Sequence, residues 1–122
     1  ALVVEGEFSY ESGYAGANAL LDLPDRPTAI FAANDDMAAG VICAVCERGL
    51  SVPDDISVCG FDDTPIARQI YPALTTVRQP TREMGQLAAI ELLKEIREMG
   101  SGGVVDAGYT LQVRRSTGPV PG

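Results

Sequence analysis

Residues 28–36 read Thr-Ala-Ile-Phe-Ala-Ala-Asn-Asp-Asp, a continuous apolar run that ends in a polar cluster. A short run of this kind is typical of a strand that is covered on both faces of a parallel sheet. Asn34 or Asp35 can cap a following helix, which we expect to extend to Arg48 and to end at Gly49. The stretch therefore predicts a strand that leads directly into a helix, the repeating unit of α/β folds.

Apolar runs and helical patterns alternate on both sides of this stretch. We expect further strands at residues 1–4, 56–61, 74–77 and 109–113, and helices at 11–23, 65–71 and 81–99. In the last of these helices one face is apolar and is expected to point inward: Met84, Leu87, Ala88, Leu92 and Ile96. The order of elements predicts the α/β fold class, as a three-layer, Rossmann-like parallel sheet with helices on both faces.

Length and charge exclude several classes of protein. The 122 residues suffice for one core, and no apolar run is long enough to cross a membrane. Residues 1–63 carry 12 acids and 2 bases, residues 64–122 carry 5 acids and 7 bases, and the net charge is −8. Apart from Arg114-Arg115 no basic cluster is present, so this chain is not expected to grip DNA by itself. The absence of histidine excludes Ser-His-Asp, Cys-His and histidine-ligated metal chemistry within the chain.

Three cysteines raise the question of redox or metal chemistry. Cys43 and Cys46 form a C-x-x-C pair, but they lie well inside a predicted helix rather than at its N-terminus, where the thiol pKa would be lowered. We therefore expect them to be small buried core residues. Unpaired thiols are typical of a reducing cytoplasm.

Two polar clusters follow neighbouring predicted strands, and ligands of open parallel sheets bind at the carboxyl ends of strands. Asn34 follows the strand at 28–33 and Asp62 follows the strand at 56–61, so both are expected at one edge, with side chains within about 8 Å of each other. An amide beside a carboxylate suits a ligand rich in hydroxyl groups. The alternative is helix capping and loop solvation, which would account for Asp35, Asp36 and Asp63.

A second alternative is a phosphoacceptor receiver domain, in which paired carboxylates hold Mg²⁺. Such a site also needs a lysine after the last strand. Here Arg114 stands at that place, and the single lysine of the chain, Lys94, lies within a predicted helix. The sequence therefore favours a small-molecule site over a phosphorylation site.

Five stretches of the sequence resemble signatures of the LacI/GalR family of bacterial transcription regulators. They occur in the family's order and extend over essentially the whole chain: Pro27 to Ala38, Gly49 to Val58, Gly60 to Thr64, Pro72 to Pro80 and Leu111 to Thr117. Several motifs of this length at family spacing make a specific signal.

The resemblance implies the C-terminal part of a periplasmic-binding-protein-like effector domain, which has two lobes around a cleft. Residues 1–78 and about 108–118 would belong to the C-terminal lobe, and about 80–103 to the N-terminal lobe. The DNA-binding headpiece would be absent from this chain. Helix 81–99 would then pack in the other lobe. Where that lobe is missing, the helix would either fold back on its own sheet or dock on a neighbouring chain, and the extended exit expected at Gln79-Pro80 favours the neighbouring chain.

The resemblance also implies effector-binding residues. Asn34 matches the amide that meets effector hydroxyls, Asp62 the carboxylate that binds a hydroxyl pair, and Phe8 the aromatic residue on which the effector stacks. Gln79 matches a position at the crossover between the lobes. The arginine that usually clamps the effector would lie upstream of this chain.

The expected function is the sensing of a small-molecule effector, a sugar or related polyol, by a cytoplasmic regulator that is not an enzyme and needs no metal or cofactor. Operator DNA would be bound through the missing headpiece. A homodimer is expected, with residues 65–71 and the helix at 37–48 as its surface. The alternatives, in order, are a periplasmic-type sugar-binding protein for transport and the receiver domain.

Overall fold

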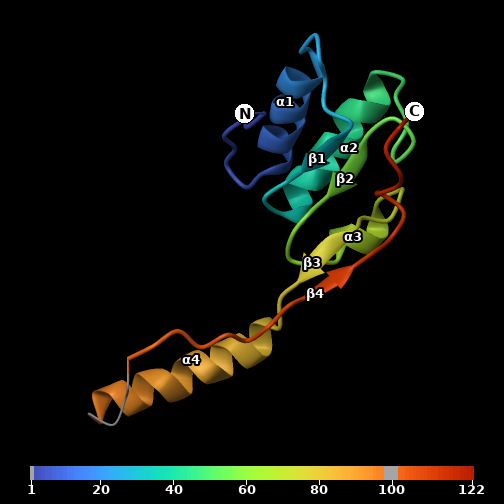
Figure 1. Cartoon of the computed structure of the whole chain (residues 1–122). Helices are drawn as coiled ribbons and strands as arrows, with labels where there is room; N and C mark the ends of the chain where they lie inside the picture. The colour runs from blue at the N-terminus through green and yellow to red at the C-terminus, as the bar shows by residue number, and fades with distance from the viewer. Residues whose placement is uncertain (1, 98–101) are drawn as a thin grey trace. The chain divides into compact units, whose positions relative to one another are not determined.

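The computed structural model describes residues 2–97 and 102–122, which form two compact units. Unit 1 comprises Ala1–Arg78 together with Leu111–Gly122, and unit 2 comprises Gln79–Thr110. Unit 1 is thus built from two separate stretches of the chain, and it contains most of the regular structure (Figure 1).

The elements of unit 1 alternate as the sequence predicts. They are α1 (Tyr10–Leu21), β1 (Ala29–Phe31), α2 (Asp35–Glu47), β2 (Ser57–Cys59), α3 (Ile66–Gln69) and β3 (Thr76–Arg78), and β4 (Thr110–Gln112) follows unit 2. β1 and β2 are parallel, with Ala29, Ile30 and Phe31 opposite Ser57, Val58 and Cys59. The predicted α/β fold class is confirmed.

The other edge of β2 is bordered by segments that are far away in the sequence. The backbone N–H of Gly60 donates to Thr75 at 3.0 Å and that of Asp62 donates to Val77 at 2.8 Å, so the chain after β2 runs parallel to β3. The N–H of Val58 donates to the carbonyl of Ser116 at 2.7 Å. The C-terminal stretch, red in Figure 1, is therefore part of unit 1.

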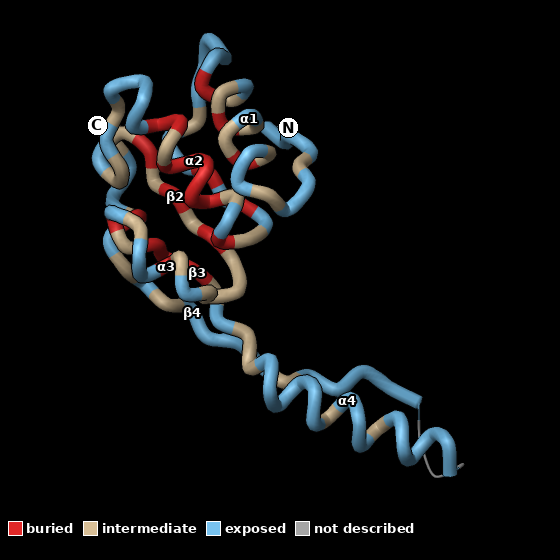
Figure 2. Tube along the Cα trace, turned by 180° about the vertical axis from the view of Figure 1, so that it is seen from behind, coloured by how far each residue is buried: buried red, intermediate tan, exposed pale blue. Residues whose placement is uncertain are grey.

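The core is formed by buried side chains of α1, β1, α2, β2 and α3 together with Ile56 and Leu74, and buried segments, red in Figure 2, gather around α2 and β2. Its largest fully buried apolar side chains are Ile56, Leu74, Val45 and Val58.

α1 and α2 approach each other unusually closely. A Cβ at Gly13 would overlap the Met37 carbonyl, and one at Gly40 would overlap the Tyr10 carbonyl. Glycine is thus required where the two helices meet.

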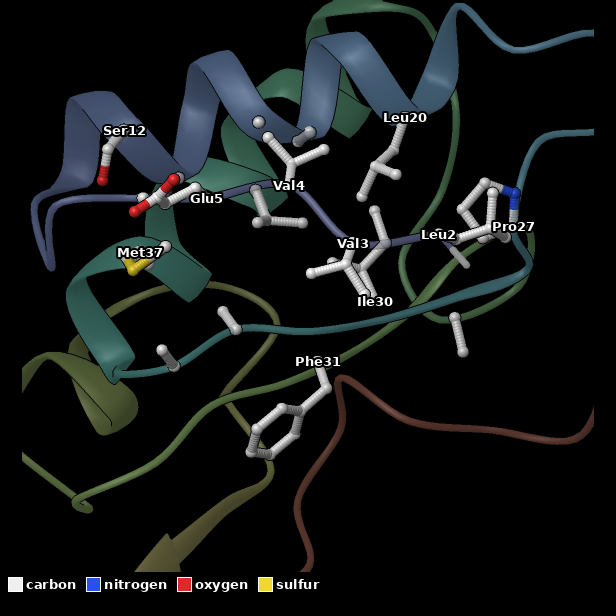
Figure 3. A pocket seen from close by; sticks show the side chains of 18 of the residues that line it. Leu2, Val3, Val4, Glu5, Ser12, Leu20, Pro27, Ile30, Phe31 and Met37 are labelled. Atoms are coloured by element: carbon white, nitrogen blue, oxygen red, sulfur yellow. The ribbon is translucent and has the colours of Figure 1, made fainter.

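Two expectations for the sheet were wrong. β1 is buried on one face only, because Ile30 is buried while Phe31 is 64% exposed and points the opposite way (Figure 3). Residues 2–4 were predicted to be a strand, but they form no strand, since no neighbouring backbone pairs with them.

A slot of about 440 Å³ lies between residues 2–6 and β1, lined by apolar side chains that include Val3, Val4, Leu20 and Ile30.

Unit 2 contains α4 (Thr81–Ile96), which confirms the predicted helix up to Ile96, whereas Met99 lies outside the described residues. No described residue of α4 is buried. Met84, Leu92 and Ile96 are exposed, so the apolar face of α4 is not buried within this chain, and its packing in the other lobe or on a neighbouring chain stays a prediction. No helix in the described parts of the chain is long and apolar enough to span a membrane.

Candidate functional site

The site predicted from the sequence lies at the carboxyl ends of β1 and β2. Phe31 pairs with Cys59 in the parallel register, and Asn34 and Asp62 each follow their strand by the same three residues. The loops are also linked directly, because the Thr64 backbone N–H donates to the Asp35 carboxylate at 2.7 Å. Asn34 and Asp62 therefore stand at the same edge of unit 1, while their side-chain separation stays a prediction.

Asn34 has two structural roles at this edge. It is the N-cap of α2, and its side-chain oxygen accepts the backbone N–H of Met37 at 2.8 Å. Its side-chain amide donates to the carbonyl of Phe8 at 3.0 Å. Of the two predicted caps, Asn34 is the correct one. By bonding Phe8, Asn34 also holds the loop before α1 against the start of α2.

Phe8 has a left-handed backbone with φ of 57°, which is uncommon for a bulky residue. The residue is 68% exposed, and it borders the slot beside β1. Ser9, which follows, caps α1 in a reciprocal arrangement with Ser12. The strained backbone is thus held from both sides, by the α1 cap and by Asn34, and the aromatic ring is presented to solvent.

Asp62 and Asp63 also have left-handed backbones, with φ of 107° and 55°. Together with Phe8 they are the non-glycine residues of positive φ among those that the structure describes. Asp62 is half-buried, and its backbone N–H is bonded to Val77. Such conformations cost about 1–3 kcal/mol each and are concentrated at binding sites.

Asp35 is completely buried, which corrects the interpretation of this residue as a cap or solvated loop residue. Besides the Thr64 N–H, its carboxylate accepts the hydroxyl of Thr64 at 3.2 Å and that of Thr76 at 2.5 Å. The helix period offered a signal, because Asp35 shares a face with the buried residues Ala38, Ala39 and Ile42. Asp35 ties α2 to the loop after β2 and to β3.

Asp63 was also expected to be solvated, but its side chain is only 1% exposed. Its carboxylate binds three guanidinium groups: that of Arg68 at 2.9 Å, that of Arg78 at 2.6 Å and that of Arg114. These four residues are called the Asp63 cluster below. No local pattern predicts the cluster, because its arginines lie 5, 15 and 51 positions after Asp63.

Burial alone would raise the pKa of Asp63, but hydrogen bonds from Arg114, Arg78 and Arg68 outweigh it and lower the pKa from 3.8 to about 2. Because folding lowers this pKa, the stabilisation is fully present above pH 3.8 and is lost as the pH falls through about 2. We expect the free-energy advantage of the wild type over Asp63→Asn to shrink by about 2 kcal/mol across this interval.

Urea unfolding of both proteins between pH 5 and pH 2 measures this difference. A difference that stays constant over the whole interval would contradict the assignment.

Gln79 and the cysteines are the remaining candidates. Gln79 begins unit 2, whose position relative to unit 1 is not determined. Among the cysteines, Cys46 is exposed and Cys43 and Cys59 are half-buried, so the expectation that Cys43 and Cys46 are buried core residues was wrong. Within the described residues, no group of three or more Cys, Asp or Glu side chains could hold a metal ion.

The fold and the site edge define a known class of protein, since residues 3–117 match the family model of the periplasmic binding protein-like domain. The chain is 45% identical over 120 residues to the HTH-type transcriptional repressor PurR of Pectobacterium carotovorum, covering 98% of this chain and 35% of the relative.

Among solved structures, the Lac repressor dimer bound to operator and the anti-inducer ONPF is 37% identical, with a TM-score of 0.87 over 93% of this chain and 40% of that one. A LacI family transcriptional regulator from Enterococcus faecium with bound ribose is 35% identical, with a TM-score of 0.77 over 93% and 42%.

The chain belongs to the LacI family of transcription regulators and carries part of their effector-binding domain. It spans about a third of the length of the curated relative and about two fifths of the two solved structures.

Proposed function

We propose that this chain senses a small-molecule effector, a sugar or related polyol, for a cytoplasmic LacI-type repressor. The observation that carries the proposal is the strained backbone at the site edge. Phe8 and Asp62 both have positive φ, and Asn34 bonds the Phe8 carbonyl. The cost of these conformations is accounted for by a ligand that needs an aromatic surface and a carboxylate at this edge. The ribose bound to the Enterococcus regulator supports the choice of a sugar.

In this proposal the effector acts by a population shift. A ligand that binds one arrangement of the two lobes more tightly than another favours that arrangement, and the arrangement sets the affinity of a headpiece for operator DNA. Gln79, at the start of unit 2, is proposed to take part where the chain passes between lobes. The operator-bound Lac repressor dimer among the similar structures supports this coupling.

A homodimer is proposed as well, because the Lac repressor neighbour is a dimer. Within residues 65–71, which are proposed as part of the dimer surface, fewer apolar side chains are available to a partner than the sequence suggested. Ile66 and Ile70 are half-buried, and Ile70 packs against the core of unit 1. Tyr71, which is 84% exposed, is the large apolar side chain of this segment that is available to a partner.

The effector assignment is tested with Asp62→Ala in the intact polypeptide that contains this chain. Loss of the carboxylate leaves ligand hydroxyl groups unpaired, which costs about 1–3 kcal/mol per bond. We expect effector affinity to fall at least about tenfold, measured by calorimetric titration with the best ligand of a sugar and polyol panel.

The matched control is Asp36→Ala, because Asp36 is an exposed carboxylate in the first turn of α2. This variant should bind like the wild type. Equal affinity of Asp62→Ala and the wild type, or a wild type that binds no member of the panel, would overturn the proposal.

A further inference from the structure

The Asp63 cluster gathers three separate parts of unit 1 around one buried carboxylate. Arg68 comes from α3, Arg78 is the last residue of β3, and Arg114 follows β4. Arg114 is fixed further, because its guanidinium donates to the Leu74 carbonyl at 2.8 Å and its backbone N–H to the Thr75 hydroxyl at 2.9 Å. The carboxylate therefore holds together the two stretches of chain that make up unit 1, Ala1–Arg78 and Leu111–Gly122.

The cluster also stands where the chain passes between the units. Arg78 is the last residue before unit 2, and Arg114 lies three residues after the chain re-enters unit 1 at Leu111. Asp63 directly follows Asp62, whose backbone N–H is bonded to Val77, next to Arg78. Asp63 is thus the sequence neighbour of the site residue Asp62, and it is also ion-paired to both segments that connect the units.

The backbone at Asp62 and Asp63 needs such support. Two consecutive non-glycine residues with positive φ persist only where surrounding contacts over-determine the conformation. For Asp63 those contacts are the three guanidinium groups. For Asp62, the backbone bond to Val77 supplies one, so a shift of β3 would be felt at Asp62.

We infer that Asp63 is a positioning residue that links Asp62 to both connections between the units. Through this link, binding of an effector at Asp62 changes how tightly Asp63 binds Arg78 and Arg114, which stand at the two segments that connect the units. The Asp63 carboxylate thereby transmits the presence of the effector to these segments. This second part rests on the proposed function, whereas the mechanical linkage does not.

The linkage is tested without ligand by amide hydrogen exchange on the 122-residue chain. In Asp63→Asn we expect exchange at the amides of Asp62 and Arg115, which donate to Val77 and Ala73, to accelerate at least about tenfold more than exchange at core amides of α2 such as Val45, which report the loss of global stability. Asp22→Asn is the control, because it weakens an exposed ion pair with Arg48. It should leave both reporter amides unchanged.

Where Asp63→Asn does not fold, Arg78→Gln replaces it, because Arg78 is half-exposed and its loss leaves Asp63 paired with Arg68 and Arg114. This variant should speed exchange at Asp62 and spare Arg115. A uniform increase at all amides, including those of α2, would show that Asp63 serves global stability only and would overturn the linkage.

The signal is tested in the intact polypeptide with the effector and operator used for the wild type. Asp63→Asn should reduce the effector-induced change in operator affinity at least about tenfold, and by more than it reduces effector affinity itself. Equal losses of affinity and response would overturn the signalling role. A wild type that binds no effector would refute the proposed function and the signalling role together, and the exchange experiment would still decide the linkage.

Discussion

Gly40→Ala is expected to lower the free energy of unfolding of unit 1 by about 3 kcal/mol, and Gly13→Ala by a similar amount. In each case the new methyl group meets backbone atoms of the facing helix: Tyr10 and Tyr14 for Gly40, and Met37 for Gly13. A side chain could rotate away, but a helix backbone cannot. α1 and α2 must therefore separate and loosen the core between them.

The direction of this effect opposes helix propensity, which by itself favours alanine over glycine by about 1 kcal/mol inside a helix. Gly85→Ala provides the control, because Gly85 lies within α4 with no atom near its Cβ position. It should stabilise α4 or change nothing. Urea unfolding followed by circular dichroism separates the three variants, and a Gly40→Ala protein as stable as the wild type would refute the close helix contact.

Asp35→Ala is expected to cost about 3 kcal/mol or more in unfolding free energy, because it removes the acceptor for three donors at once. The Thr64 N–H, the Thr64 hydroxyl and the buried Thr76 hydroxyl would lose their partner. In this unit the carboxylate is also packed against Gly60, where an added Cβ would lie 2.5 Å from it. Asp35→Ala should therefore lower the unfolding free energy through lost packing against Gly60 as well as through the lost hydrogen bonds.

Asp36→Ala, one position along α2 and exposed, is the comparison for thermal or urea unfolding and should change stability by less than about 0.5 kcal/mol. Thr76→Val removes one of the donors and should fall between the two variants. If Asp35→Ala unfolds at the same urea concentration as Asp36→Ala, Asp35 does not hold the loops of this edge together.

The sequence was sufficient to predict elements whose determinants are local. α2 follows an asparagine cap, and Gly49, whose φ of 71° suits glycine, stands two residues after its last residue, Glu47, so both signals are local. The strand at residues 1–4 was predicted from composition alone, but a strand also needs a hydrogen-bonded partner, and among the described residues no strand pairs with residues 2–4. Apolar composition shows that a segment is able to form a strand, but it does not show which other segment would pair with it.

The candidate site divides in the same way. Asn34 and Asp62 follow strands whose parallel pairing the α/β pattern implied, so their common edge was predictable. The assignment of Phe8 depended on resemblance, because nothing local reveals that its backbone is strained. Asp63 looked like a loop acid, and its arginines come from distant parts of the chain. Partners separated by this much sequence leave no periodic pattern.

The place of Ser116 bears on how the chain folds as it is synthesised. Its buried hydroxyl donates to the Val58 carbonyl at 2.6 Å and accepts the Thr75 N–H at 2.8 Å, so it completes the edge of β2. A ribosome reaches Ser116 only after it has synthesised all of unit 2, which takes roughly 2–6 s at translation rates of about 5–20 residues per second. During that time β2 and β3 stand without their last partner, and a chaperone has several seconds in which to bind them.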